Sequence, residues 1–583
     1  MIFRKITGIC AFAVAAGLIA LFPSCSSYVP NNTEVRIHSL SDPDMLNPIN
    51  YQSADAGYIT NILFPALLNI DFADSNKVIP VLAESRPKLE KTNDGHLKIS
   101  FVIRKEAVWD NGTPVTARDV EFTLKVIKNP KVKNEQNKPY YEFIEDIQID
   151  PSDPKKFTLL CNEVYMLAET SAGDYGLLPE YVYDPKGLMR SFTLPQLNKE
   201  KDKLSSDPKI NEFANDFNSE KRMREKDYIS GCGAYKMVEW TTGQRIVLEK
   251  KKDWWGDALK GVNCYFEAYP KKLIYQTIND QTTAIVSLKA GNLDVMYSIK
   301  PKDFVDLKAS DKIKSTFNLH TPPFLSYYYF GINTKNKKFE DKKTRQALAH
   351  LVDIPKMIHT LMYDLATQVT GFIHPSNTRD YEKSIQPYDF DIEKAKALLT
   401  EAGWKDSNGD GTLDKMIDGV LTDFTIKFSV NAGNDVRKQA ALMFQEEARK
   451  VGIKVDVIQQ DWSVYLQNQK NHDFEMYFGG WVASPTPNDP KQIYHTESYN
   501  GGSNYVGFGN PESDAVIDSL RKELDENKRS AYYKKLQLIL HDECSYIYLW
   551  APTERMAINK KFTNAEPSVM RPGFWPCAFQ TAK

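Results

Sequence analysis

Residues 406–414 carry side chains that could bind a metal ion. Counted from Asp406, oxygen-bearing side chains fall at positions 1, 3, 5 and 9, and a glycine falls at position 6. These side chains belong to Asp406, Asn408, Asp410 and Asp414. The spacing is typical of loops that curl around Ca²⁺, but position 12 is Ile417 and not the bidentate Glu of an EF-hand. We expect either a weak calcium loop or an Asx-rich turn between a helix and a strand.

Cys25 is a second residue that could undergo chemistry. It follows Ser24 and an uncharged, mostly apolar run over residues 6–22, which two basic residues precede. A basic start, a short apolar run and a small residue are typical of a secretory signal peptide. The small residue before the cysteine is similar to a lipobox, in which the thiol is acylated. We expect a signal peptide at 1–24 and a lipidated tether at 25–34; an ordinary signal peptide or an uncleaved anchor is the alternative.

The rest of the chain lacks the motifs of common enzymes and metal sites. There is no G-x-S-x-G, no H-E-x-x-H and no phosphate-binding loop of the Walker type. The five cysteines after Cys25 form no C-x-x-C, and the nine histidines are scattered. The net charge is −2, so no basic field for nucleic acid is expected. These observations favour a binding protein over an enzyme.

Residues 97–128 predict a strand, a turn and a helix in succession. The apolar residues that alternate with polar ones are Leu97, Ile99, Phe101 and Ile103. This period of two is typical of a half-buried strand. Residues 110–112 read Asp-Asn-Gly, which favours a turn. Thr116 and Asp119 have the spacing of a capping box, so we expect a helix to begin there.

The residue identities in this region resemble the diagnostic segment of a known family. Residues 101–122 fit the pattern F-x-I-R-K-x-A-x-W-x-(N/D)-G-x-P-(V/L)-T-A-x-D-V-x-F. On this segment the chain is similar to the extracytoplasmic solute-binding proteins, family 5, the oligopeptide-, dipeptide- and nickel-binding class of ABC importers. Further segments resemble the family in its usual chain order, namely 42–71, 230–255, 330–358, 391–404, 473–481 and 504–514. The resemblance covers most of the chain.

The resemblance implies an α/β fold of the two-lobed periplasmic-binding-protein type, class II and large, with an extra N-terminal subdomain. A chain of 583 residues is also too long for a single core. The predicted parts are the lobe I core at 35–70, 181–325 and 550–583, the extra subdomain at 71–180, and lobe II at 326–549. We expect a hinge of two crossover segments, at the aromatic strands 327–330 and 547–550, whose closure would enclose a ligand.

The resemblance also points to residues that would contact a ligand. In peptide-binding members, an Asp shortly after the Gly-Trp end of a strand pairs with the peptide α-amine; Ser484 stands at that place here, and Asp489 follows it. Dipeptide binders hold the carboxylate with an Arg where this chain has Asn431. The amine anchor is therefore expected to be absent or displaced to Asp489. A longer peptide, held mainly by its backbone, fits better than a dipeptide of fixed length.

Three more residues are candidates for the ligand site. Trp481 is expected to stack or pack on the ligand, with a core position beneath the cleft as the alternative. Asn504 and Tyr505 are expected to donate to ligand carbonyls, with a loop-capping role as the alternative. Together with Ser484 and Asn431, they complete the predicted lining.

These observations lead to one functional hypothesis and its alternatives. We expect a lipid-anchored substrate-binding protein of an ABC importer that captures oligopeptides between its lobes and delivers them to a permease. It would work as a monomer on the periplasmic face of a bacterial membrane, with no required cofactor and no nucleic-acid partner. The alternatives are a non-peptide solute such as a nickel chelate or an opine, and, in a different class, a secreted lipoprotein hydrolase.

Overall fold

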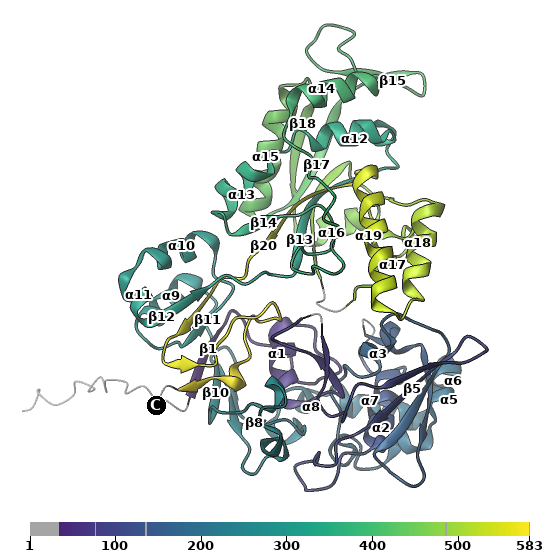
Figure 1. Cartoon of the computed structure of the whole chain (residues 1–583), viewed down its shortest axis with the longest axis vertical. Coiled ribbons are helices and arrows are strands. Elements are labelled where there is room, and N and C mark those ends of the chain that lie inside the picture. The colour runs from purple at the N-terminus through teal and green to yellow at the C-terminus, as the bar shows by residue number, and fades with distance from the viewer. Residues whose placement is uncertain (1–33, 76, 135–136, 484–486, 582–583) are drawn as a thin grey trace, which may run out of the picture.

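Two large β-sheets divide the chain into two lobes, drawn one above the other in Figure 1. The computed structural model describes residues 34–75, 77–134, 137–483 and 487–581. Helices and strands alternate through both lobes, so the fold is mixed α/β with two lobes, as the sequence predicts.

The sheet of lobe I has seven strands taken from distant parts of the chain. Their spatial order is β12 (Phe317–His320), β21 (Met556–Asn559), β11 (Val295–Met296), β1 (Glu34–Ser39), β10 (Lys272–Thr277), β9 (Arg245–Lys250) and β8 (Tyr235–Thr241). Three helices lie beside the β11–β12 edge, namely α9 (Gln281–Lys289), α10 (Pro301–Ala309) and α11 (Asp311–Thr316). Leu288, Phe304 and Met296 share a buried core there, which fixes these helices to the sheet.

The extra subdomain is built around a four-stranded antiparallel sheet. Its order is β4 (Lys88–Lys91), β5 (Leu97–Val102), β7 (Lys156–Cys161) and β6 (Ile144–Ile149). The predicted strand, turn and helix are confirmed here as β5, a turn with Gly112 at φ 81°, and α2 (Ala117–Lys128). The backbone N–H of Thr116 donates to the Asp119 carboxylate at 2.7 Å, which is the predicted capping box.

The sheet of lobe II has six strands and helices on both sides. Its order is β14 (Ala366–Gln368), β20 (Tyr546–Pro552), β13 (Ser326–Ile332), β19 (Met476–Val482), β17 (Thr425–Asn431) and β18 (Lys454–Gln460). The ring of Phe330 lies 4.8 Å from that of Phe428 and 5.8 Å from that of Phe444 on α15 (Asp435–Arg449), centre to centre. These edge-to-face contacts hold the helix on the sheet.

The chain crosses between the lobes twice, and the two crossings are neighbours. Residues 321–325 join β12 to β13, and residues 553–555 join β20 to β21. Pro323 and Thr553 form an antiparallel bridge, so the crossings run side by side. Such a pair of short segments is the geometry of a hinge.

The position predicted for these crossings is wrong by a few residues. Residues 327–330 and 547–550 lie inside β13 and β20, which pair with each other near the middle of the lobe II sheet. Their side chains are mostly buried because helices and the cavity wall cover the two faces of this sheet. The aromatic run therefore marks a central strand and not a crossing.

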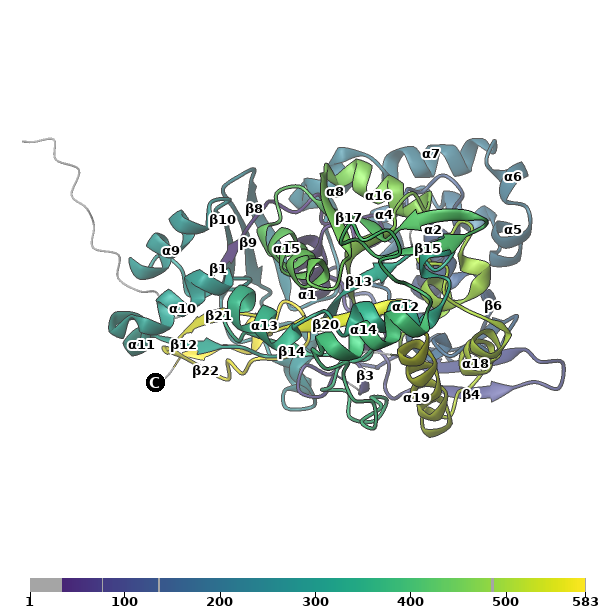
Figure 2. The ribbon, with the colours of Figure 1, turned by 90° about the horizontal axis from the view of Figure 1, so that it is seen from above.

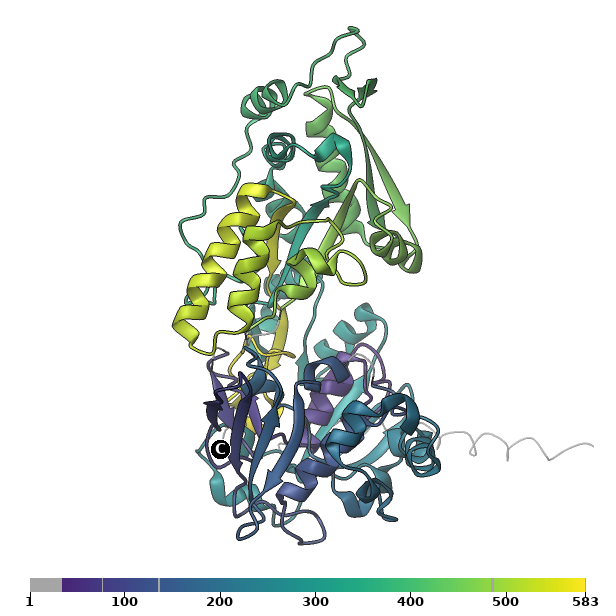
Figure 3. The same cartoon turned by 90° about the vertical axis from the view of Figure 1, so that its right-hand side faces the viewer.

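Lobe II also touches the extra subdomain through helices that extend downward from it. These are α17 (Lys491–Tyr494), α18 (Pro511–Arg521) and α19 (Glu526–Glu543), and in Figure 1 they lie above α3 (Ala168–Ser171). The views from above and from the side show the same arrangement (Figures 2 and 3). The backbone N–H of Met166 donates to the carbonyl of Arg521 at 2.8 Å, so the contact is direct.

Candidate functional site

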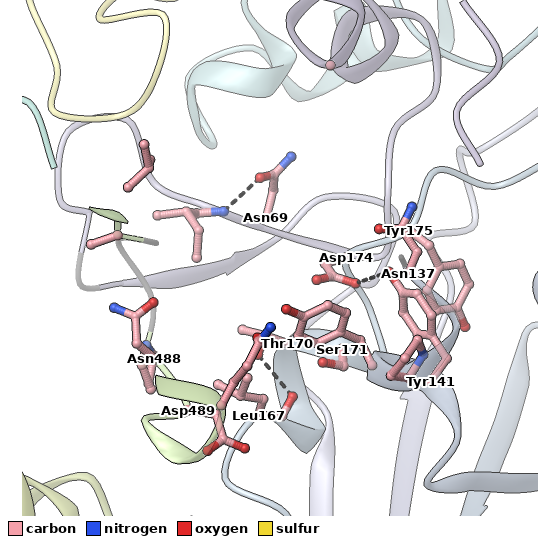
Figure 4. Close-up of a pocket in the computed structure, with 18 of the residues that line it drawn as sticks. Asn69, Asn137, Tyr141, Leu167, Thr170, Ser171, Asp174, Tyr175, Asn488 and Asp489 are labelled. Atoms are coloured by element: carbon pink, nitrogen blue, oxygen red, sulfur yellow. Dashed lines mark hydrogen bonds between the residues drawn. The ribbon is translucent and has the colours of Figure 1, made fainter. Parts of the chain in front are cut away.

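A cavity of about 1450 Å³ lies between the lobes. Lobe I lines it with residues before and within α1 (Ala54–Leu63), among them Tyr51 and Tyr58. The extra subdomain contributes Asn137, Tyr141, Asp174 and Tyr175, and lobe II contributes Trp481, Asn488, Asp489 and Arg521 (Figure 4). Because three parts of the chain supply its walls, the cavity is complete only when the lobes meet.

The lobe II wall is backed by a cluster of tyrosines. The hydroxyl of Tyr327 lies 2.8 Å from that of Tyr494, which lies 3.3 Å from that of Tyr548. All three side chains are buried, and burial raises the pKa of each phenol above its ordinary value. Tyr327 and Tyr494 also line the cavity. This part of the lobe II wall is therefore aromatic and uncharged.

Trp481 lies on the cavity wall near the end of β19. Its packing on a ligand stays a prediction. Its ring stacks on that of Tyr505, with centres 6.3 Å apart and planes at 22°. The indole Nε1 is enclosed and has no hydrogen-bond partner among the described residues. Tyr505 supports Trp481 from behind and is not among the residues that line the cavity.

Asp489 lines the cavity, but its carboxylate already has partners. Arg521 Nε donates to Oδ2 at 2.7 Å, and the backbone N–H of Lys491 donates to Oδ1 at 3.0 Å. The hydroxyl of Tyr165, from the extra subdomain, donates to Oδ2 at 3.2 Å. The Arg521 guanidinium also lies 5.4 Å from the centre of the Tyr165 ring. Asp489 therefore joins lobe II to the extra subdomain, a role that the sequence did not suggest.

Asp174 is an acidic residue of the cavity that the sequence analysis missed. Its carboxylate accepts a hydrogen bond from the Tyr141 hydroxyl at 3.1 Å. The side chain is exposed to the cavity, whose walls surround much of the carboxyl group. Exclusion of bulk water raises the pKa of this carboxyl to about 6, and the hydrogen bond from Tyr141 opposes the shift. The short segment around Asp174 has no motif that could have marked it.

Amide side chains complete the polar part of the lining. Asn137 and Asn488 lie on different walls of the cavity (Figure 4). Asn69, on β2 (Leu68–Ile70), also faces the cavity and accepts from the backbone N–H of Ile70 at 2.9 Å. Amides both donate and accept, so they can pair with the N–H and C=O groups of a peptide backbone. Aromatic faces with a few amides and one unpaired carboxylate suit binding and not bond cleavage.

Two further predicted residues, like Tyr505, lie away from the cavity lining. Asn504 is fully buried; its amide donates to the carbonyls of His495 and Phe508, and its oxygen accepts from the Phe508 N–H. It holds its own loop, which is the alternative stated from the sequence. Asn431, at the end of β17, accepts from Arg437 at 2.9 Å. Ser484 and Cys25 lie outside the described residues.

The candidate calcium loop is held by hydrogen bonds to its own backbone. The Asp406 carboxylate accepts from the N–H groups of Gly409 at 2.8 Å and Gly411 at 3.0 Å. Asp410 accepts from the Thr412 N–H at 2.7 Å, and buried Asp414 accepts from the Ser407 N–H at 2.8 Å. Within the described ranges, no group of three or more His, Cys, Asp or Glu side chains has a metal-binding arrangement. These contacts are those of an Asx-rich turn.

The cysteines of the described part are structural. All five are free, and four of them are buried, namely Cys161, Cys232, Cys544 and Cys577. Burial raises the pKa of the Cys161, Cys232 and Cys544 thiols to about 12, so they stay protonated at neutral pH. None of these five lines the cavity, which leaves it without a thiol nucleophile.

Comparison with known proteins gives consistent matches over most of the chain. The family model described as bacterial extracellular solute-binding proteins, family 5 Middle, matches residues 77–504. The oligopeptide-binding protein AppA of Bacillus subtilis (strain 168) is 28% identical over 575 residues, which is 95% of this chain and 95% of that protein. The periplasmic oligopeptide-binding protein OppA of Escherichia coli (strain K12) is 25% identical, covering 92% of this chain and 90% of that protein.

Solved structures match the fold. AppA from Bacillus subtilis in complex with a nonapeptide has a TM-score of 0.67 and 25% identity, covering 94% of this chain and 99% of that chain. NikA from Brucella suis in complex with Fe(III)-EDTA has a TM-score of 0.73 and 20% identity, covering 94% of this chain and 100% of that chain. The second match bears on the fold alone, because the sequences are too different to carry ligand contacts across.

Proposed function

Because the chain belongs to the bacterial extracellular solute-binding proteins, family 5, we propose that it binds an oligopeptide in the cavity between its lobes. Members of this family bind solutes and are not enzymes, and the absence of catalytic motifs in the sequence agrees with this. The hydrolase alternative is therefore set aside. The size of the enclosed cavity is the observation that carries the proposal.

The cavity exceeds the space that a small solute needs. Its volume of about 1450 Å³ lies above the roughly 300–1,000 Å³ of pockets for drug-sized ligands. Its walls combine the tyrosine cluster, the ring of Trp481 and the amides of Asn137 and Asn488. A peptide offers repeated carbonyl and N–H groups to such walls, and its side chains can occupy the remaining space. Relatives named as oligopeptide-binding proteins, one of them solved with a nonapeptide, support this choice.

A non-peptide solute remains the alternative ligand. A bare nickel ion would require metal ligands, and a small chelate or an opine would suit a smaller, more strongly charged pocket. The cavity has neither feature within the described part of the chain, since its wide walls are largely aromatic and amide-bearing. An oligopeptide accounts better for this lining.

We place the protein, as a monomer, on the periplasmic face of a bacterial membrane, held by lipid on Cys25. The sequence before Cys25 supports the anchor, because it has the order of a signal peptide followed by a lipidated cysteine. No helix in the described ranges is both long enough and apolar enough to cross a bilayer. From this position the protein would pass peptide to an ABC permease, with hinge opening at 321–325 and 553–555 releasing the ligand.

The proposal is tested by identifying the solute that co-purifies with the full chain. Mass spectrometry of the denatured protein should detect peptides, and refilling the emptied protein with peptides of two to nine residues should define the preferred length. Isothermal titration calorimetry should show tighter binding for peptides longer than two residues. A co-purified metal chelate, with no binding of any peptide, would contradict the proposal.

A further inference from the structure

The charged side chains of the cavity wall differ in whether an oppositely charged side chain pairs with them. Those with a carboxylate or a cationic group are Asp174, Asp489, Lys491, Arg521 and Arg571. Asp489 pairs with Arg521 at 2.7 Å, and Lys491 pairs with Glu497 at 2.8 Å. Asp174 accepts from the neutral hydroxyl of Tyr141, and no Lys, Arg or His of the described residues forms an ion pair with it. It is the wall carboxylate whose charge is left uncompensated.

The described surroundings of Asp174 hold no cation that balances its charge, and they suit one. The rings of Tyr141 and Tyr175 meet edge to face with centres 5.5 Å apart, and both residues line the cavity with Asp174 (Figure 4). Burial keeps the pKa of both phenols well above the ordinary value, so neither residue adds charge. An ammonium or guanidinium group beside a carboxylate and aromatic faces gains both ionic and cation–π attraction.

We propose that Asp174 anchors a cationic group of the bound peptide, either its α-ammonium group or the ammonium or guanidinium group of a side chain. The inference rests on the proposed function and adds a chemical class to it. The anchor lies on the extra subdomain, across the cavity from Asp489 of lobe II. A ligand held by Asp174 contacts the extra subdomain. If it also packs on Trp481 of lobe II, it bridges the two walls of the cavity.

The test compares cationic and neutral peptides in matched pairs. The first pair is pentaalanine with a free or an acetylated amino terminus, and the second is an acetylated pentapeptide amide with central lysine or norleucine. An equimolar mixture is offered at pH 7.5 to the full wild-type chain, to Asp174→Asn and to a surface control, Asp311→Asn, whose side chain is 96% exposed. Native mass spectrometry after buffer exchange then measures which peptides each protein retains.

We expect the wild type and Asp311→Asn to retain the cationic member of at least one pair by tenfold or more. Asp174→Asn should lose at least tenfold of this preference, and the affected pair tells whether the α-amine or the side chain is held. The wild type alone gives a second readout, because its preference should fall several-fold between pH 7.5 and pH 5.0. This second readout does not depend on whether the variant folds.

Two contrary results can be told apart. One overturns only the role of Asp174, and the other overturns peptide binding itself. If the wild type retains peptides without preference, or if Asp174→Asn keeps the preference, the assignment of Asp174 is overturned while peptide binding stands. If neither protein retains any peptide, the proposed function is overturned and the assignment falls with it.

Discussion

Nε of Arg521 lies 2.7 Å from Oδ2 of Asp489, so the carboxylate predicted to anchor a peptide amine already has a cationic partner in its own lobe. The same oxygen accepts from Tyr165 of the extra subdomain. Asp489 therefore connects lobe II to the extra subdomain. Arg521 already balances most of the charge of Asp489 before a ligand binds.

Asp489→Asn should destabilise the protein without selecting among peptides. Arg521 is only about a quarter exposed, and leaving a partly buried polar partner unsatisfied costs roughly 1–3 kcal/mol. Urea denaturation should show a loss of that size in the free energy of unfolding. Calorimetry should show equal changes in affinity for free and acetylated peptides. A loss confined to peptides with a free amine would instead identify Asp489 as the amine anchor.

Tyr165→Phe should favour the open arrangement of the lobes. The change removes one hydrogen bond between the extra subdomain and Asp489 and keeps the ring, and such a bond contributes about 1 kcal/mol. Small-angle X-ray scattering of the peptide-free protein should show a larger radius of gyration, and peptide affinity should fall a few-fold. Tyr363→Phe, which removes an exposed hydroxyl of lobe II, is the matched control and should change neither. Identical scattering from all three proteins would contradict this role.

Asp174→Asn should make the peptide-free protein more stable at neutral pH. The pKa of Asp174 is raised from 3.8 to about 6 in the folded protein. Its protonated form therefore adds stability below pH 3.8, and this contribution is lost as the pH rises through 6. Because the side chain is exposed within the cavity, solvent screens part of this effect, and removing the ionised group should raise Tm at pH 7.5 by about 1 °C. The difference should vanish near pH 4, as measured by differential scanning fluorimetry.

The pH dependence can be assigned because the neighbouring groups do not titrate in this range. Burial raises the pKa of Tyr51, Tyr141 and Tyr175, so these phenols stay neutral below pH 8. An equal Tm difference at pH 4 and pH 7.5 would show that the effect of the substitution is not electrostatic.

Asp406→Ala should weaken the loop 406–414 whether or not calcium is present. The substitution removes the acceptor for the N–H groups of Gly409 and Gly411. Tm should fall by a similar amount in Ca²⁺ and in EDTA, and the wild type should show no shift between these conditions. A wild-type Tm that rises with Ca²⁺ and loses this response in Asp406→Ala would establish a calcium site.

Cys25→Ala should release the protein from the membrane. Without the thiol there is no site for lipid attachment at this position. Cell fractionation and metabolic labelling with a fatty acid should show unlabelled protein in the soluble fraction. Labelled, membrane-bound Cys25→Ala protein would contradict the lipid anchor.

Local signals were enough to predict the strand, turn and helix of the extra subdomain. Thr116 and Asp119 lie three residues apart, so the bond that starts α2 is encoded within one helical turn. The position of Trp481 near the end of a glycine-rich strand was also readable from the local sequence. These features depend on neighbours in sequence, and pattern analysis reaches them.

Other features depend on contacts between distant segments, and sequence patterns could not supply them. The sequence of residues 327–330 and 547–550 suggests crossings between the lobes. The pairing of these two strands with each other is visible only in the folded sheet. Asp174 became a site residue because lobe II closes over it, and nothing in its local sequence records that closure. The ion pair between Asp489 and Arg521 likewise forms only because α17 and α18 pack together in the fold.

The side-by-side crossings at 321–325 and 553–555 form a hinge about which one lobe can rotate relative to the other. Both lie to the left of the space between the lobes in Figure 1, whereas α3 and α17–α19 lie farther to the right. Tyr165 precedes α3 and Asp489 precedes α17, so the bond between them belongs to that far side. A small rotation at the paired crossings produces the largest displacement at that far rim. A single hydrogen bond from a hydroxyl group at this rim can therefore oppose rotation of the whole lobe. The same hydrogen bond next to the hinge would hardly affect that rotation.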